Sequence, residues 1–355
     1  MSPLTSSSKE DPIGLVEAAY RAEADQKAWL NQLADAARSF DRGLGLVAFS
    51  ARIVPAYGLR IDANATRNMD KGLEDFLSAA TEEDPSMGAQ TVQRGASGAA
   101  ATLSEAMGLD VLSARMGPAQ RWGCKDLLGI MSVDPGGSVV GLMVALHEIG
   151  GLSRRERVQW DRLSAHVVAG QRLQRRLLEA NVARDAESDL GDAILRPDGH
   201  VEHASESAKT PAARVSLRNA AIAMDRARSS LRRKDPDEAL SLWRALISGR
   251  WSLVDKFDSD GRRYLIAHKN DPRTRALAAL TTREQQVTTY LALGHSNKRI
   301  AYELGVSESS VSEVGRRSLT KLGISSRADL ARLYAGNIDE SDARERRRES
   351  DDTVE

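Results

Sequence analysis

The sequence predicts a multidomain α+β protein, with two regions of antiparallel sheet and helix followed by a region of helices alone. Three turn signals lie between apolar runs, as is typical of β-hairpins, at residues 134–137, 197–199 and 258–261. Stretches with helical spacing of apolar residues separate these hairpins. After residue 280 only the helical spacing remains. The pattern therefore places the sheets first and an all-α unit at the C-terminus.

Length, composition and charge limit the range of functions. The chain has 355 residues, of which 41% are apolar and 28% charged, as is ordinary for a globular protein of two or three domains. Its 50 basic residues equal its 50 acidic ones, so the formal net charge is zero. We therefore do not expect the chain to coat nucleic acid along its whole length, although one basic patch can be balanced by acidic regions elsewhere.

Cysteine usage and the first residues indicate the cellular setting. Cys124 is the one cysteine, so neither an intrachain disulfide nor a cysteine-based zinc site can form. The opening MSPLTSSSKEDP lacks the basic and then apolar order of a signal peptide. No apolar run approaches the length of about 20 residues that spans a bilayer. We expect a cytoplasmic protein that contacts no membrane.

The first mixed region is expected to span residues 13–187. Helical spacing at 13–40 is followed by an apolar run rich in β-formers at 44–54, which predicts a buried strand. Residues 68–108 return to a helical composition. A hairpin then leads into a long amphipathic helix at 152–187, whose apolar face continues beyond the strands that it could cover. We expect this helix to offer a seam for dimerisation.

The second mixed region covers residues 188–275. It begins with the hairpin at 193–204 and ends with the hairpin at 250–270. Between them, helical spacing predicts a basic amphipathic helix at 211–233 and a further helix at 239–249. The region is therefore expected to form a small antiparallel sheet with helices inserted between its two hairpins.

The C-terminal region has the spacing of a helix-turn-helix. Ala301 allows close approach of two helices, Gly305 permits a sharp turn, and the β-branched Val311 fills the junction. These residues belong to the second and third of four expected helices. The helices are expected at 281–294, 296–305, 307–323 and 326–336.

The third of these helices has one apolar side and one side suited to DNA. Its inner side is expected to carry Val311, Val314, Gly315, Ser318, Leu319 and Leu322. Its outer side carries Ser309, Ser312, Glu313, Arg316 and Arg317, with Lys321 near the end. Arginine suits guanine edges or phosphates, and glutamate can accept a hydrogen bond from a cytosine amino group. Spacing alone also fits two helices that merely close a small core.

Four short motifs lie between Leu280 and Leu330. They read L-T-x-R-E, S-N-K-x-I-A, S-x-x-[ST]-V and K-L-G-[IV]-x-[ST]-R-x-[DE]-L. With them the region resembles the LuxR-type, or GerE-type, DNA-binding domain of bacterial regulators. Family members often have a basic residue at the position of Ser312 and histidine at that of Val314, so the preferred DNA sequence stays open.

The resemblance implies partners and functional residues. It implies binding to double-stranded DNA, a homodimer, and a contact with RNA polymerase. The DNA-binding residues would be Asn297, Lys298, Ser309, Ser310, Ser312, Glu313, Arg316, Arg317 and Lys321. The fourth helix would help dimerisation through Leu330, Leu333 and Tyr334.

The two mixed regions resemble small sensor domains. Residues 13–187 resemble a GAF domain and residues 188–275 a PAS domain, whereas no phosphoreceiver aspartate pattern, phosphate-binding loop or aromatic acyl-homoserine-lactone pattern is found. The expected division is a disordered N-terminus at 1–12, a GAF-like domain at 13–187, a PAS-like domain and connector at 188–275, a helix-turn-helix domain at 276–337, and a disordered charged tail at 338–355.

These observations favour a one-component transcription regulator that senses an unknown signal. The alternative is a protein-interaction adaptor whose helix-turn-helix no longer reads DNA. Residues that could bind a metal or act in catalysis do not combine into a site. His200 and His203 are expected to face opposite sides of a hairpin, and Asp161 and His166 form no catalytic pair. We expect no enzyme activity, no metal and no evident cofactor.

Overall fold

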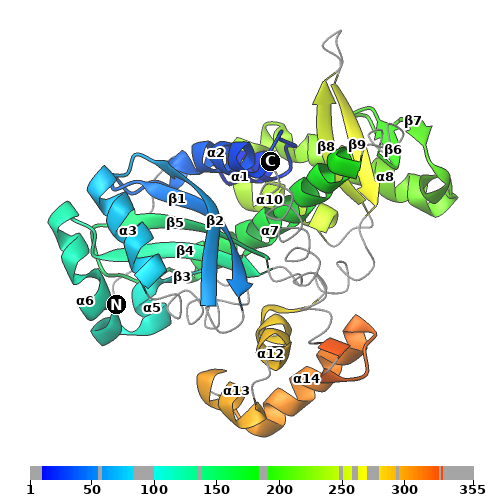
Figure 1. Cartoon of the computed structure of the whole chain (residues 1–355). Coiled ribbons are helices and arrows are strands. Elements are labelled where there is room, and N and C mark those ends of the chain that lie inside the picture. The colour runs from blue at the N-terminus through cyan, green and yellow to red at the C-terminus, as the bar shows by residue number, and fades with distance from the viewer. Residues whose placement is uncertain are drawn as a thin grey trace, which may run out of the picture.

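Two antiparallel sheets with their helices, followed by a group of C-terminal helices, make up the protein (Figure 1). The computed structural model describes residues 10–54, 58–83, 100–133, 138–183, 191–247, 251–257, 263–269, 280–292, 296–304, 306–327 and 329–330. The α-helices are α1 (Pro12–Ala19), α2 (Gln26–Ala37), α3 (Lys71–Glu83), α5 (Leu103–Met107), α6 (Leu109–Met116), α7 (Arg154–Ala183), α8 (Pro211–Arg228), α9 (Leu231–Lys234), α10 (Pro236–Ile247), α12 (Thr282–Ala292), α13 (Asn297–Leu304) and α14 (Glu308–Leu322).

The first sheet has five strands in the order β2-β1-β5-β4-β3, all antiparallel. Its strands are β1 (Leu46–Val54), β2 (Gly58–Arg67), β3 (Ala101–Thr102), β4 (Asp126–Val133) and β5 (Ser138–Leu146). The pairing of β4 with β5 confirms the hairpin that the sequence predicts, while its turn lies outside the described residues. The sequence did not predict β2 or β3.

Two helices, and not one, precede this sheet. The spacing of apolar residues predicts a single helix at 13–40, but α1 ends at Ala19 and α2 begins at Gln26. A side chain caps each start, because Asp11 accepts a hydrogen bond from the amide of Gly14 and Asp25 accepts one from the amide of Ala28. The caps turn the chain and let both helices cover the same face.

The two faces of the first sheet are covered differently, since successive side chains of a strand point to opposite sides. On the inner face, strand residues such as Leu46 and Leu142 pack in one cluster with residues of α1, α2 and α7. On the outer face, α3, α5 and α6 contribute to the cover, and the buried residues form two separate clusters. We call these two sides the inner and the outer face.

Helix α7 uses its apolar face inside the protomer. Trp160, Leu163 and Val167 are buried in the inner cluster. Gly170 allows α1 to approach, because a Cβ at that position would lie 2.2 Å from the carbonyl oxygen of Ala19. Part of the apolar face of α7 is therefore covered by α1 and by α10 of the same chain, and a dimer contact along α7 stays a prediction.

The second sheet has four antiparallel strands in the order β7-β6-β9-β8, with α8 and α10 packed beside it. The strands are β6 (Ala193–Leu195), β7 (Val201–Ala204), β8 (Trp251–Phe257) and β9 (Arg263–Lys269). Both hairpins predicted in this region pair as expected. The predicted helix at 211–233 is interrupted after Arg228, so α8 and α9 are separate helices.

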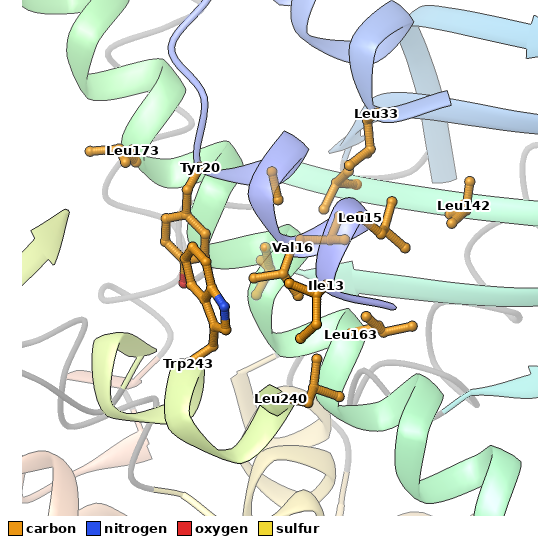
Figure 2. Packing of buried hydrophobic residues seen from close by; sticks show 14 of the residues in the cluster. Ile13, Leu15, Val16, Tyr20, Leu33, Leu142, Leu163, Leu173, Leu240 and Trp243 are labelled. Carbon is orange, nitrogen blue, oxygen red and sulfur yellow. The ribbon is translucent and has the colours of Figure 1, made fainter. Parts of the chain in front are cut away.

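The two sheets share one hydrophobic core, which crosses the predicted boundary near residue 188. Figure 2 shows Tyr20 against Trp243, and their rings are stacked with centroids 5.6 Å apart. His166 of α7 meets Trp243 edge-on, and its Nδ1 lies 3.4 Å from the hydroxyl of Tyr20. Ion pairs surround this junction, since Arg228 and Arg232 both contact Glu17 of α1. The mixed regions thus pack as one body.

Candidate nucleic-acid interface

A small aliphatic core holds α12, α13 and α14 together. Val287, Leu291, Ile300 and Val311 are buried in it. Gly315 lets α14 approach α12, because a Cβ there would lie 3.0 Å from Cδ1 of Leu291. This packing confirms that the spacing of Ala301 and Val311 joins two helices, whereas Gly305 lies outside the described residues.

The L-T-x-R-E motif clamps α12 to both of its neighbours. Thr281 and Glu284 form a reciprocal capping box at the start of α12, with bonds of 2.8 Å and 3.3 Å. Arg283 donates a 3.0 Å hydrogen bond to the carbonyl oxygen of Leu304, the last residue of α13. Lys321 of α14 donates to the buried carboxylate of Glu284 at 2.8 Å. A few polar contacts of this motif therefore hold the three helices in their relative positions.

Glu284 is held in its charged form by these contacts. Burial raises the pKa of Glu284, but hydrogen bonds from Lys321 and Thr281 outweigh it and leave the pKa below its usual value. Lys321, which the resemblance assigns to DNA contact, thus has a structural partner. Its side chain is still 44% exposed, so a phosphate can approach it as well. Its DNA contact stays a prediction.

Both ends of α14 are fixed by local hydrogen bonds. Ser307 caps the start by accepting from the amide of Ser310. At the other end Gly323 adopts a left-handed conformation with φ 68°, and the amide of Ile324 donates to the carbonyl of Leu319 at 3.0 Å. Hydrogen bonds therefore define where the helix begins and ends.

The exposed side of α14 is the one that the sequence predicts. Its exposed residues are Glu308, Ser309, Ser310, Ser312, Glu313, Arg316, Arg317, Thr320 and Lys321. Val311, Gly315 and Ser318 are buried on the opposite side, and Val314, Leu319 and Leu322 are partly buried there. The placement is confirmed, and contact of the exposed side chains with DNA stays a prediction.

Glu313 lies between two arginines on this surface. Arg316 donates to its carboxylate through Nη2 at 3.0 Å and through Nε at 3.3 Å. Nε of Arg317 lies 3.5 Å from the same carboxylate. All three side chains are more than half exposed, and exposed pairs contribute little to stability. The arginines can therefore exchange the carboxylate for groups on DNA.

Asn297 connects α13 to the exposed side of α14. Its Nδ2 donates to Oγ of Ser312 at 2.7 Å, and its Oδ1 accepts a hydrogen bond from Arg327. Lys298 is exposed beside it. Arg327 was not assigned to the site from the sequence, although the closing motif contains it. The surface that adjoins α14 therefore gains two exposed basic residues, Lys298 and Arg327, from beyond the helix.

The residues assigned to dimerisation are only partly described. Leu330 is fully buried in the core of this unit, and Ser326 and Asp329 form the cap of the turn that holds it. A dimer contact through Leu330 would have to replace those core contacts. Leu333 and Tyr334 lie outside the described residues.

Residues 278–334 match GerE, the family described as bacterial regulatory proteins, luxR family. The C-terminal region is a luxR-family domain. This match confirms the resemblance carried by the four motifs. The luxR-family domain covers the described helices α12 to α14 and the turn that holds Leu330.

Whole-chain comparisons add little to this domain. The crystal structure of SdiA from Escherichia coli in space group P6522 has 12% sequence identity over 82% of each chain, with a TM-score of 0.28. SdiA in complex with octanoyl-rac-glycerol matches with 12% identity and a TM-score of 0.28, over 82% of this chain and 81% of that chain. Similarity at this level carries no inference about the fold or ligand of the mixed regions. None of the curated proteins matches the chain.

Candidate sites outside the luxR-family domain do not assemble into a reactive centre. His200 and His203 are exposed, and Asp161 accepts a hydrogen bond from the amide of Ala100 instead of facing His166. Burial raises the pKa of Cys124 to about 11, so its thiol stays protonated. Within the described ranges, no cluster of His, Cys, Asp and Glu could hold a metal ion, and no helix could cross a membrane.

Proposed function

We propose that the chain is a sequence-specific DNA-binding transcription regulator in which α14 enters the major groove. The observation that carries the proposal is the exposed side of α14 in a luxR-family domain. Arg316, Arg317 and Glu313 can reach base edges or nearby phosphates, while the opposite side of their helix packs in a hydrophobic core. Lys298 and Lys321 would contact the backbone and fix the register.

We further propose that residues 13–275 sense a signal and control the luxR-family domain. Antiparallel sheets with helices on them support the GAF-like and PAS-like interpretations of residues 13–187 and 188–275. The shared core of the two sheets supports the view that a change in one is transmitted to the other. The proposal includes a cytoplasmic homodimer that contacts RNA polymerase, and no catalytic step.

Binding of genomic DNA fragments tests the proposed reading of DNA. In a gel-shift experiment, the wild-type chain should retain a subset of fragments at moderate salt. The Arg316→Ala/Arg317→Ala variant should lose that preference while its circular dichroism spectrum stays unchanged. A matched variant, Arg214→Ala/Arg218→Ala, removes two exposed arginines of α8 and should bind like wild type.

Two results would contradict the proposal. If the wild type showed no preference among fragments even at low salt, the protein-interaction adaptor would be the better account. If both double variants lost binding equally, the affinity would come from general positive charge and not from α14.

A further inference from the structure

The outer face of the first sheet contains a cavity. The cavity has a volume of about 100 Å³ and lies between the strands, α3 and the α5–α6 segment. Phe49, Met131 and Met143 form its floor, and Leu77 and Met116 form its walls. We call it the outer pocket. Figure 1 shows α3, α5 and α6 on this part of the sheet, away from α8 and the second sheet.

The outer pocket lies between two hydrophobic clusters, and Met143 packs against both of them. Met116 and Leu77 belong to the cluster built by α3, α5 and α6, and Phe49 and Met131 belong to the cluster at the far end of the strands. Protein cores are normally packed continuously, with few voids larger than a water molecule. An apolar occupant would fill the remaining void and add contacts to both clusters.

Gly141 keeps the outer pocket open. It lies opposite Phe49 in the pairing of β1 with β5, and a Cβ at Gly141 would lie 2.2 Å from Cζ of the Phe49 ring. The ring can therefore rest flat against the sheet. A side chain at position 141 would push it away from the strand and into the pocket.

One edge of the outer pocket is polar. Asn64 and Thr66 line it from β2, and Ser78 lines it from α3. Within the described part of the chain, the side chains of these residues form no hydrogen bond with one another or with a neighbour. Glu74, which also lines the pocket, is paired with Lys71 at 3.5 Å. Arg115 of α6 also lines the pocket, so the lining adds one basic and one acidic side chain to these hydrogen-bonding groups and has no net charge.

Size and lining together define the chemistry of an occupant. An apolar cavity of about 150 Å³ stays dry and binds benzene, so a cavity of about 100 Å³ with flexible methionine walls suits a molecule of similar size. We propose that the outer pocket binds a small, uncharged, mostly apolar molecule with one hydrogen-bonding group, such as a single ring with a hydroxyl. The role of this ligand as the signal rests on the proposed function.

Methionine methyl groups report directly on the occupant. Met69, Met116, Met131 and Met143 line the outer pocket, whereas Met224 is buried in the inner cluster beside α8. In the full chain labelled with ¹³C at the methionine methyls, phenol should shift the four lining signals and leave Met224 in place. Shifts of all methyls alike, or of none, would overturn the inference.

Variants and related probes test the lining. Gly141→Ala should weaken phenol binding at least tenfold, because Phe49 then fills the space. Should that variant fail to fold, Asn64→Leu should weaken phenol binding by about threefold to tenfold, the effect of one hydrogen bond, and leave toluene binding unchanged. Benzoate should bind more weakly than phenol, because most of the lining is apolar and burying the carboxylate there costs its hydration. Equal binding of phenol by wild type and variants would contradict the assignment.

The same titration separates the site from its regulatory role. DNA affinity is measured by fluorescence anisotropy with and without saturating phenol, once the methionine shifts have been recorded. A change in DNA affinity supports the outer pocket as the sensing site. Methionine shifts without a change in DNA affinity would keep the binding site and refute its role as the signal site. Loss of DNA binding in both conditions would refute only the proposed reading of DNA.

Discussion

The body formed by the two sheets and the luxR-family domain are stabilised in different ways. The former buries large aromatic side chains, including Trp29, Trp160 and Trp243, in one extended core. The latter has a small, mostly aliphatic core, and polar clamps from Arg283 and Glu284 fix its helices. Apolar burial scales with area and tolerates exchange of similar residues, whereas a polar clamp needs particular atoms at particular places. Substitutions should therefore act by different mechanisms in the two regions.

The largest effect is expected at the junction of the two sheets. Trp243→Ala should lower the free energy of unfolding by about 3–5 kcal/mol, because it removes a fully buried indole between α1, α7 and α10. Chemical denaturation followed by tryptophan fluorescence measures this, since all five tryptophans precede the luxR-family domain. Val215→Ala, at an exposed position of α8, should change it little. A small effect of Trp243→Ala would show that the two sheets fold independently.

Acid should weaken the same junction through His166. Burial lowers the pKa of His166 to about 3, and a hydrogen bond with the backbone of Leu240 offsets only part of this shift. The unfolded chain takes up the proton below its ordinary pKa of 6.5, while the folded chain does not. Stability is therefore full above 6.5 and falls by up to about 1.4 kcal/mol per pH unit between 6.5 and 3.

A substitution isolates this pH dependence. The free energy of unfolding of His166→Gln, taken from denaturation curves, should fall less than that of wild type between pH 6 and about 4. This range lies between the ordinary pKa of histidine and the lowered pKa of His166. His200→Gln, at an exposed position, should leave the loss as it is in wild type. An unchanged slope in His166→Gln would assign the acid sensitivity to other groups.

A smaller effect is expected from the polar clamp of the luxR-family domain. Glu284→Gln should destabilise this domain by about 1–2 kcal/mol, through the loss of its ion pair and weakening of the capping box. Because the pKa of Glu284 is lowered on folding, its contribution is present above 4.5 and is lost as pH falls through the lower folded value.

Hydrogen exchange measured by mass spectrometry locates this effect. Peptides from residues 280–330 should exchange faster in Glu284→Gln, while peptides from the two sheets should not change. Glu206→Gln, which removes an exposed charge paired with Lys209, serves as a control and should leave all peptides unchanged. Faster exchange throughout the chain would show that the two regions are not stabilised separately.

The smallest effect is expected at Glu313. Glu313→Gln removes a carboxylate from beside the two arginines, which should raise affinity for DNA of arbitrary sequence by about threefold, the size of one charge interaction several ångströms away in water. Anisotropy titrations on a scrambled duplex measure the change. A loss of affinity confined to the preferred fragment would instead assign Glu313 to base recognition.

The contrast between the two regions also explains what the sequence could predict. Arg283, Glu284 and Lys321 lie in the motifs that carry the family resemblance, but their contacts with one another's helices were not predicted, and Lys321 was assigned to DNA alone. The residues that make the inner core, such as Tyr20 and Trp243, meet from distant parts of the chain and carry no local pattern. Their contact, and with it the shared core, could not be predicted.

Strand β2 also could not be predicted from its own residues. It contains Arg60 and Asp62, which weaken its β pattern, but these charges suit the edge of a sheet, where Asp62 pairs with Arg52 of β1 at 3.0 Å. Pairing with β1 decides its structure, and that pairing depends on the whole sheet. The exposed side of α14, in contrast, follows from helical spacing alone.

The central claim is that α14 reads DNA, and the salt dependence of binding tests it most directly. Affinity for the preferred fragment and for a scrambled duplex of equal length is measured by anisotropy across a series of salt concentrations. Arg316→Ala/Arg317→Ala should weaken binding to the preferred fragment by at least about tenfold, and each lost phosphate contact should reduce the salt slope by about one. Equal affinities and equal slopes for the variant and the wild type would contradict the account.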